Sequence, residues 1–245
     1  MAPNRPDEES PASSPGPRQA FSGRHALREQ DALWASFLAL TASVVKSLEK
    51  SVQVICDGRF DLISEVANQE EVSDCREVLI EQECLRILAL YEPVASDLRR
   101  MATVLKVNRD WERIANLALR VARRARRLAR NHGGMAMPEA LKQMARDVLL
   151  QVRAGYQALA SRDVAAARAV IAGDAAIDVQ YRTLRKQFKT SLGQHPEQLD
   201  VWLELMNTAR NLERIADHAA GIAQTVVYLE EGVIIRHMPA PRSAD

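Results

Sequence analysis

An internal repeat constrains this chain more than any other feature of its sequence. The segment RDWERIANLA (109–118) aligns with RNLERIADHA (210–219), six of ten residues being identical at an offset of 101 residues. The similarity extends into two apolar stripes whose members alternate in steps of three and four, the spacing of helices that pack at a shallow angle. The chain is therefore expected to contain two copies of one helical unit. The stripes are Val104, Val107, Trp111, Ile114, Ala118, Val121, Ala125 and Leu128, and Leu205, Thr208, Leu212, Ile215, Ala219, Ile222, Val226 and Leu229.

The placement of proline and glycine divides the chain into helices. Proline breaks helix interiors but is tolerated at helix starts, and only Pro93, Pro138 and Pro196 lie between residues 24 and 232. The Gly133–Gly134 pair and Gly232 stand where helices are expected to end. Together these signals predict six helices, over residues 24–56, 60–90, 93–130, 138–161, 163–192 and 196–232.

These helices and the repeat predict an all-α fold of two tandem three-helix bundles related by internal duplication. The first bundle is expected over residues 24–132 and the second over 137–237. Residues 1–23, rich in Pro and Ser, are predicted to form a disordered tail, and residues 238–245 a C-terminal tail. Aromatic residues make up 4% of the chain, which argues against a β-sandwich or barrel.

Other features favour a cytoplasmic protein. Cys56, Cys75 and Cys84 are odd in number and show no pairing or zinc-site pattern, which suits a reducing compartment. The N-terminus has no apolar segment of the kind found in secretory signals. The longest uncharged run has fourteen residues (32–45), fewer than the roughly 18 that would suggest a membrane span.

Pairs of carboxylates one helical turn apart are candidate metal ligands. Like charges at this spacing repel, and a cation would relieve the repulsion. Two neighbouring helices that each offer such a pair would suit Mg²⁺, Mn²⁺ or iron, although solvated helix faces also carry such pairs. No Glu-x-x-His pair of a ferritin-like di-metal enzyme and no persuasive nucleophile–base pair is present, so no enzymatic activity is predicted. The pairs are Glu70 and Asp74, Asp174 and Asp178, and Glu213 and Asp217.

The net charge of +1 hides a local polarity. Residues 57–97 carry eleven acidic and three basic side chains, whereas residues 99–130 carry eleven basic and two acidic ones. The arginine-rich run at 120–130 is either a solvated helix end or a docking surface for an acidic partner, lipid headgroups or nucleic acid. No aromatic residue lies between 113 and 131 to stack on bases, so nucleic acid is not expected as a partner. The candidate docking residues are Arg120, Arg123, Arg124 and Arg127.

The sequence resembles the PhoU family of bacterial phosphate-uptake regulators over about residues 25–237. The stretches that carry the resemblance are EPVASDLRRMATVLKVNRDWERIANLA (92–118) and ARNLERIADHAAGIAQTVVYLEEG (209–232). The resemblance implies two similar three-helix bundles and metal ions (iron, zinc, manganese or magnesium) held at the surface by acidic motifs. Carried over, the ligands are Asp174, Asp178, Glu213 and Asp217 in the second half, and Glu70, Asp74, Glu112 and position 116 in the first.

The family pattern is broken at position 116, where this chain has Asn116 in place of the usual Asp. Asparagine offers a carbonyl oxygen but no charge, so the first-half site is the weaker prediction. Ala115 and Ala216 also replace residues that are commonly Gly in the family.

The resemblance also implies the function. It implies a non-enzymatic adaptor between the ATPase of a phosphate ABC transporter and a phosphate-sensing histidine kinase, which restrains uptake and the starvation response when phosphate is plentiful. A homodimer that reaches the membrane only through its partners is implied as well. The alternatives that the residues leave open are a carboxylate-bound metal store or metal-dependent enzyme, and an arginine-rich nucleic-acid-binding module.

Overall fold

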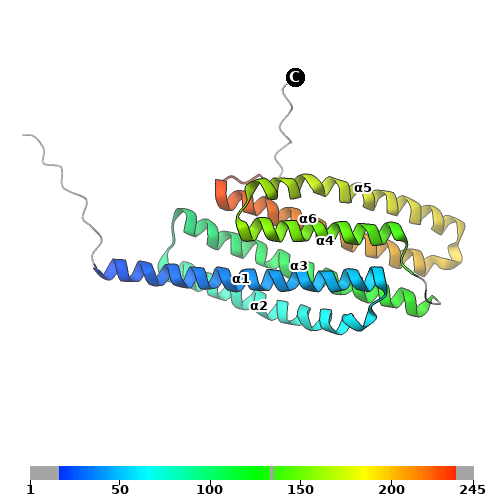
Figure 1. Ribbon diagram of the computed structural model, residues 1–245, viewed down its shortest axis with the longest axis horizontal. Coiled ribbons are helices and arrows are strands. Elements are labelled where there is room, and N and C mark those ends of the chain that lie inside the picture. Colours follow the sequence, from blue (N-terminus) through cyan, green and yellow to red (C-terminus); the bar gives the residue numbers. More distant parts are fainter. Residues whose placement is uncertain (1–16, 133, 135, 236–245) are drawn as a thin grey trace, which may run out of the picture.

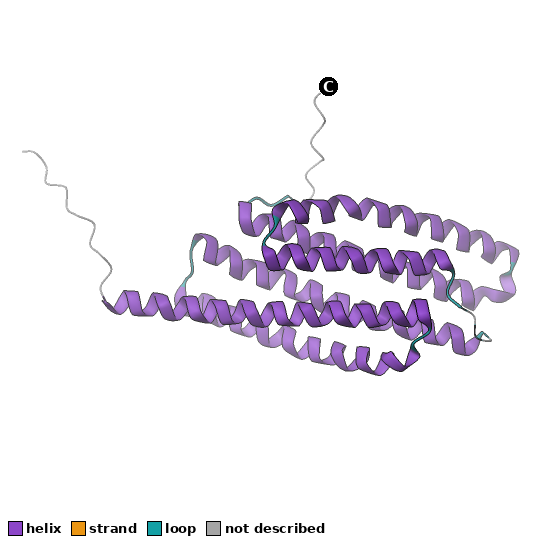
Figure 2. Ribbon diagram, in the orientation of Figure 1, coloured by secondary structure: helices purple, strands orange, loops and turns teal. Residues whose placement is uncertain are grey.

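The computed structural model describes residues 17–132, 134 and 136–235, and within them it contains six long helices and no strand (Figures 1 and 2). The predicted all-α fold is thereby confirmed. The helices are α1 (Pro17–Asp57), α2 (Ile63–Tyr91), α3 (Ala95–Asn131), α4 (Glu139–Ser161), α5 (Val164–Gln194) and α6 (Leu199–Glu231).

The first helix begins earlier than the sequence predicts. It starts at Pro17, so the prediction of a disordered tail over residues 1–23 is wrong for residues 17–23. Proline fits the first turn of a helix, where its missing N–H costs nothing. Residues 1–16 and the predicted C-terminal tail lie outside the described residues.

The other boundaries follow the proline and glycine signals to within three residues. The third helix begins at Ala95 and not at Pro93, because the chain first turns at Glu92, which ends α2 with a left-handed φ of 43°. Ala95, the first residue of α3, also has a positive φ, of 49°. Pro138 caps α4, and Pro196 opens a short 3₁₀ turn before α6. Gly232 ends α6 with a φ of 72°, a conformation that glycine adopts without strain.

The two halves lie side by side and share one continuous core (Figure 1). Within each half the three helices pack on one another, and the halves meet where α3 packs on α6 and α1 packs on α4. All sixteen residues of the two predicted stripes are buried, which confirms the duplicated pattern. The shared core places α2 and α5 on the outside of the molecule, where each packs mainly against helices of its own half.

Much of helix α1 is apolar. Residues 24–57 contain a window with a mean hydropathy of 1.2, long enough to cross a membrane by length and composition alone. Half of that window is buried inside the bundle, where Phe37, Leu40 and Leu48 have no exposed surface. A helix that is buried in a protein core has the same apolar composition, so this window alone is weak evidence of a membrane span.

Candidate metal centre

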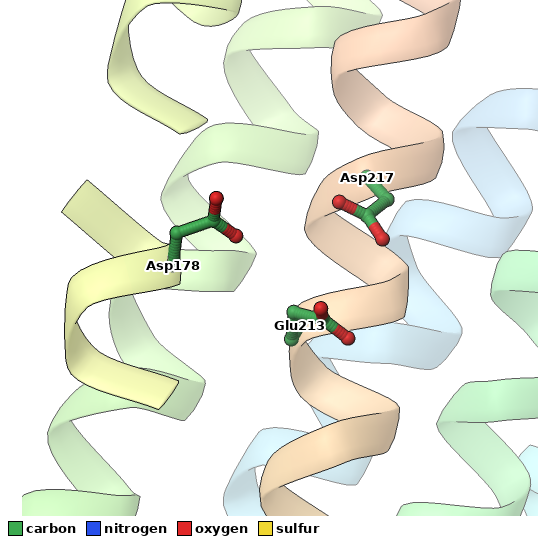
Figure 3. A group of neighbouring side chains, drawn as sticks. All are labelled: Asp178, Glu213 and Asp217. Carbon is green, nitrogen blue, oxygen red and sulfur yellow. The ribbon is translucent and has the colours of Figure 1, made fainter. Parts of the chain in front are cut away.

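Three carboxylates of the second half come together where α5 faces α6. Asp178 lies on α5, and Glu213 and Asp217 lie one turn apart on α6 (Figure 3). One oxygen from each lies within 4.8 Å of the others, and this is the only such group of three potential ligands among the residues that the structure describes. Three carboxylate oxygens at this separation fit a hard divalent cation, and further positions would remain for water.

The electrostatics of this group favour a cation. Burial raises the pKa of Glu213, and the nearby charges of Asp217 and Asp178 raise it further. Asp217 belongs to the exposed residues, yet partial desolvation of its carboxyl group raises its pKa, and the charges of Asp174 and Asp178 raise it further. A carboxylate that is desolvated and surrounded by like charges holds its proton more tightly, and a bound cation would remove that penalty.

Asp174, the remaining predicted ligand of the second half, is held by a neighbour. Gln151 on α4 donates a hydrogen bond from Nε2 to Asp174 Oδ1 at 3.0 Å. Burial raises the pKa of Asp174, while this hydrogen bond lowers it. Asp174 therefore lies beside the group of three as an anchored carboxylate and is not one of its members. Gln151 carries no signal in the sequence, because only the packing of α4 on α5 reveals its role.

Glu213 and Asp217 line a polar groove of about 630 Å³ between α5 and α6, which gives an ion a path from solvent. The arginines of this groove partly offset the negative charge, since Arg210 and Arg214 lower the pKa of Glu213 against its larger upward shift. The groove is lined by Tyr181, Arg185, Met206, Asn207, Arg210, Glu213, Arg214 and Asp217.

The predicted site of the first half is arranged differently. Asn116 donates a hydrogen bond from Nδ2 to Glu112 Oε1 on the same helix, so the amide occupies a carboxylate oxygen that would otherwise face a cation. Burial and the charges of Asp74 and Glu112 raise the pKa of Glu70, but Arg123 and Arg120 lower it. Basic side chains thus supply part of the charge compensation that a metal ion would provide.

Two arginines at the arginine-rich end of α3 form ion pairs within the molecule. Glu204 on α6 accepts a hydrogen bond from Arg124 Nη1 at 2.7 Å, and its other oxygen lies 3.3 Å from Arg127 Nε. Two of the four predicted docking arginines therefore link the halves, whereas Arg120 and Arg123 are exposed beside the first-half carboxylates.

A second link between the halves was not predicted. His218 on α6 follows Asp217 and is a conceivable ligand from the sequence, yet its Nδ1 lies 3.0 Å from Asp110 Oδ1 on α3. Both side chains are mostly buried. Asp110 has no counterpart carboxylate in the second half, where Asn211 stands at the equivalent position, so the repeat gives no signal for this pair.

The fold and this site define a class of helical proteins with two duplicated bundles and surface carboxylates, and comparisons with known proteins identify the family. The PhoU domain model matches residues 38–125 and again 141–226. A phosphate-specific transport system accessory protein PhoU homolog from Pseudomonas putida is 31% identical, over 87% of this chain and 84% of its own length. Its counterpart from Pseudomonas aeruginosa is 32% identical, over 84% and 85% respectively.

Solved structures agree with the sequence comparisons. The crystal structure of PhoU from Pseudomonas aeruginosa matches with a TM-score of 0.80 and 30% identity, covering 84% of this chain and 99% of that one. The phosphate transport system regulatory protein PhoU from Streptococcus pneumoniae matches with a TM-score of 0.77 and 26% identity, covering 85% and 98%. The chain belongs to the PhoU family.

Proposed function

We propose that this protein is an accessory regulator of phosphate-specific transport. It acts as an adaptor between the ATPase of the phosphate ABC transporter and a phosphate-sensing histidine kinase, and it restrains uptake and the starvation response when phosphate is plentiful. The observation that carries this proposal is the match of the PhoU domain to both halves. Relatives named as phosphate-specific transport accessory proteins align over most of the chain, which supports the same assignment.

The proposal includes the setting in which such an adaptor works. The protein acts as a cytoplasmic homodimer without catalytic activity and reaches the membrane only through its transporter partner. Its long helices support a role in binding, because their exposed sides offer extended faces to a partner.

Deletion of the gene tests this function. In phosphate-rich medium, a strain without the protein should express phosphate-starvation genes that the parent strain represses, and the wild-type gene in trans should restore repression. Repression that persists in the deletion strain, with no second PhoU-family gene in the genome, would overturn the proposal.

We also propose that the second half binds a divalent or iron-type cation through Asp178, Glu213 and Asp217. The carboxylate oxygens within 4.8 Å of one another support this, as do the raised pKa values of Glu213 and Asp217. A bound cation would neutralise charge between α5 and α6 and fix the two helices relative to each other. Elemental analysis of protein purified without chelator tests the proposal, because Asp217→Ala should lose the metal that the wild type retains.

A further inference from the structure

Exposed hydrophobic side chains gather on one part of the first half. Of fourteen large hydrophobic residues that are exposed among the described residues, seven lie between Val72 and Leu98, and five of these are on α2. Leu79 and Leu90 keep 62% and 61% of their surface exposed. The equivalent helix of the second half, α5, has only Val179 in this category. Scattered exposed hydrophobic residues are ordinary, but a contiguous group marks an interaction surface.

The five exposed hydrophobic residues of α2 lie on one side of the helix, which they share with the exposed Gln82 and Arg86. At 100° per residue they fall within an arc of about 140°, on the side away from the buried Ser73, Ile80, Cys84 and Ile87. A row of five within this arc alternates steps of three and four, the spacing at which one helix packs along another: Cys75, Val78, Gln82, Leu85 and Ala89, of which only Gln82 is polar. We name the following exposed residues the α2 apolar face: Val72, Cys75, Val78, Leu79, Leu85, Ala89 and Leu90.

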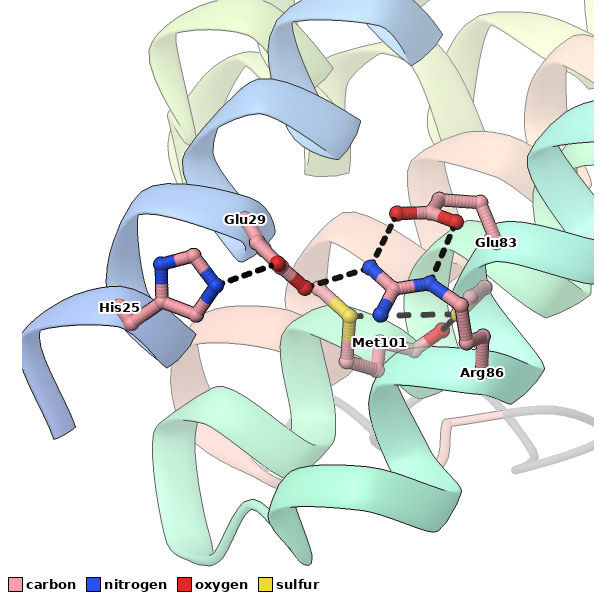
Figure 4. A network of polar contacts seen from close by, with 6 residues as sticks. His25, Glu29, Glu83, Arg86 and Met101 are labelled. Atoms are coloured by element: carbon pink, nitrogen blue, oxygen red, sulfur yellow. Dashed lines mark hydrogen bonds and ion pairs between the residues drawn. The ribbon is translucent and has the colours of Figure 1, made fainter. Parts of the chain in front are cut away.

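Negative charge borders this face. Glu70, Asp74, Glu77 and Glu81 follow one another at helical spacing along its edge toward α3. Arg109, Arg120 and Arg123 of α3 offset part of this negative charge, yet desolvation and the neighbouring carboxylates still raise the pKa values of Glu70 and Glu77. In total α2 carries seven acidic and two basic side chains, a net charge of −5. One of the two basic residues, Arg86, is paired with Glu29 at 2.5 Å and with Glu83 at 2.7 Å (Figure 4). Its charge is therefore already satisfied within the molecule.

A groove beside the face offers a place for a partner's side chain. It lies between α1 and α2, has a volume of about 410 Å³ and is lined on one side by Leu79. The other apolar residues of its lining are Ala32, Leu33 and Ile80, and its polar and charged lining residues are Glu29, Ser36, Arg76, Glu83 and Arg86. A helix lying on the α2 apolar face could insert one large apolar side chain there, as helices docked in grooves do.

We propose that the α2 apolar face binds a cationic amphipathic helix of a partner protein. The apolar stripe of that helix covers the face, and its lysines or arginines lie along the acidic edge. This goes beyond the proposed function, because it specifies the chemistry of the bound segment whichever protein supplies it.

Charge decides between this occupant and two others. A second copy of the chain would bring two helices of net charge −5 against each other. An anionic membrane surface would be repelled by the same acidic edge, since such surfaces attract basic segments. A basic helix gains both apolar burial and favourable charge pairing.

Two model peptides test the proposal with the intact protein. Both are helices of about 20 residues with a leucine stripe, one flanked by lysines and the other by glutamates. The lysine peptide should bind in a fluorescence anisotropy titration at physiological salt, and Leu79→Ser/Leu85→Ser should weaken binding at least about tenfold. The matched control, Leu150→Ser/Val179→Ser, removes leucine and valine of similar exposure (60% and 54%) from the second half and should bind like the wild type.

Cys75 provides an independent reporter in the middle of the face. It is exposed, whereas Cys84 is buried and its pKa is raised to about 11 by burial. The lysine peptide should slow maleimide labelling of Cys75 in the wild type and should leave the labelling of Cys56, on α1, unchanged.

Several results would overturn the proposal. One is a folded wild type that fails to bind the lysine peptide, and another is equal affinity for the lysine and glutamate peptides. Conversion of a dimer into a monomer by Leu79→Ser/Leu85→Ser, measured by sedimentation, would assign the face to a second copy. Loss of binding to phosphatidylglycerol vesicles in the same variant would assign it to the membrane.

Discussion

The two halves of this molecule share a core but differ on their surfaces. Equivalent stripe positions of α3 and α6 are buried throughout, so the duplicated packing is intact. On the outside, the second half gathers Asp178, Glu213 and Asp217 into one group. The first half instead has Asn116 bonded to Glu112, arginines near Glu70, and an exposed apolar face on α2. After duplication the core constrains both copies equally, whereas each surface is free to take its own binding role.

The largest expected effect tests whether the halves are one folding unit. Trp111 and Leu212 occupy equivalent positions and are fully buried in the shared core. Trp111→Ala should lower the free energy of unfolding by about 3–5 kcal/mol and Leu212→Ala by about 2–5 kcal/mol, and each variant should still unfold in a single transition. Calorimetry measures both quantities. A separate early transition for the half that carries the substitution would show that the halves unfold independently.

The next largest expected effect is a difference between the two halves in metal binding. At about one hundred times its dissociation constant, Mn²⁺ should stabilise the wild-type protein by about 2.7 kcal/mol in thermal unfolding. Asp217→Ala should abolish this gain and the bound metal, whereas Asn116→Ala should keep both, because its amide faces Glu112 and not the group of three. Equal losses of metal by elemental analysis in the two variants would contradict this difference between the halves.

The ion pair that joins the halves should have an intermediate effect. Glu204 binds Arg124 and Arg127, and Glu204 and Arg124 are only 21% and 24% exposed. Glu204→Gln should lower the free energy of unfolding by about 1–2 kcal/mol in urea denaturation, because it weakens a charge-assisted contact that water reaches poorly.

The control for this pair is Glu139→Gln. Glu139 pairs with Arg146 but is 73% exposed, so its loss should cost less than about 0.5 kcal/mol. If both substitutions cost the same, the contact between the halves is no stronger than an ordinary surface pair.

The smallest effect concerns pH. The pKa of Asp217 is raised in the folded state by burial and by Asp174 and Asp178, so the folded protein binds this proton more tightly than the unfolded chain does. This contribution to stability is present below the unfolded pKa and is lost as the pH rises through the folded pKa. In chelator at pH 7, Asp217→Asn should therefore stabilise the protein, by about 0.2–0.5 kcal/mol or roughly 1–2 °C.

The stabilisation by Asp217→Asn should shrink toward pH 4. At pH 7 with Mn²⁺ added, the variant should instead be less stable than the wild type, because it lacks a metal ligand. Scanning fluorimetry at the two pH values measures both changes. Destabilisation by Asp217→Asn in chelator at pH 7 would mean that the carboxylate is not repelled by its neighbours.

Most of the fold follows from the sequence because it depends on periodic patterns. The stripes of α3 and α6 specify which faces are buried, and the prolines and Gly232 limit the helices. The start of α1 at Pro17 did not follow, because Pro and Ser in the preceding residues resemble a disordered segment. A proline at the first helical position is compatible with either state, so composition alone does not decide it.

The site was predictable only in part. Spacing along one helix identifies Glu213 with Asp217, and Asp174 with Asp178, but which oxygens meet depends on how α5 packs on α6. The bond from Gln151 to Asp174 and the contact of His218 with Asp110 join different helices, and no periodicity encodes them. The acidic content of α2 is evident from the sequence, whereas its uncovered apolar face emerges only once the core is known.

Direct binding of the purified protein to the organism's own phosphate-transporter ATPase and phosphate-sensing histidine kinase is the most decisive test of its role. Titration by calorimetry at physiological salt, with the protein folded and supplied with Mn²⁺, should reveal a saturable complex with both. Absence of binding to both proteins under these conditions would contradict the proposed adaptor role, although the PhoU fold and the difference between its two halves would stand.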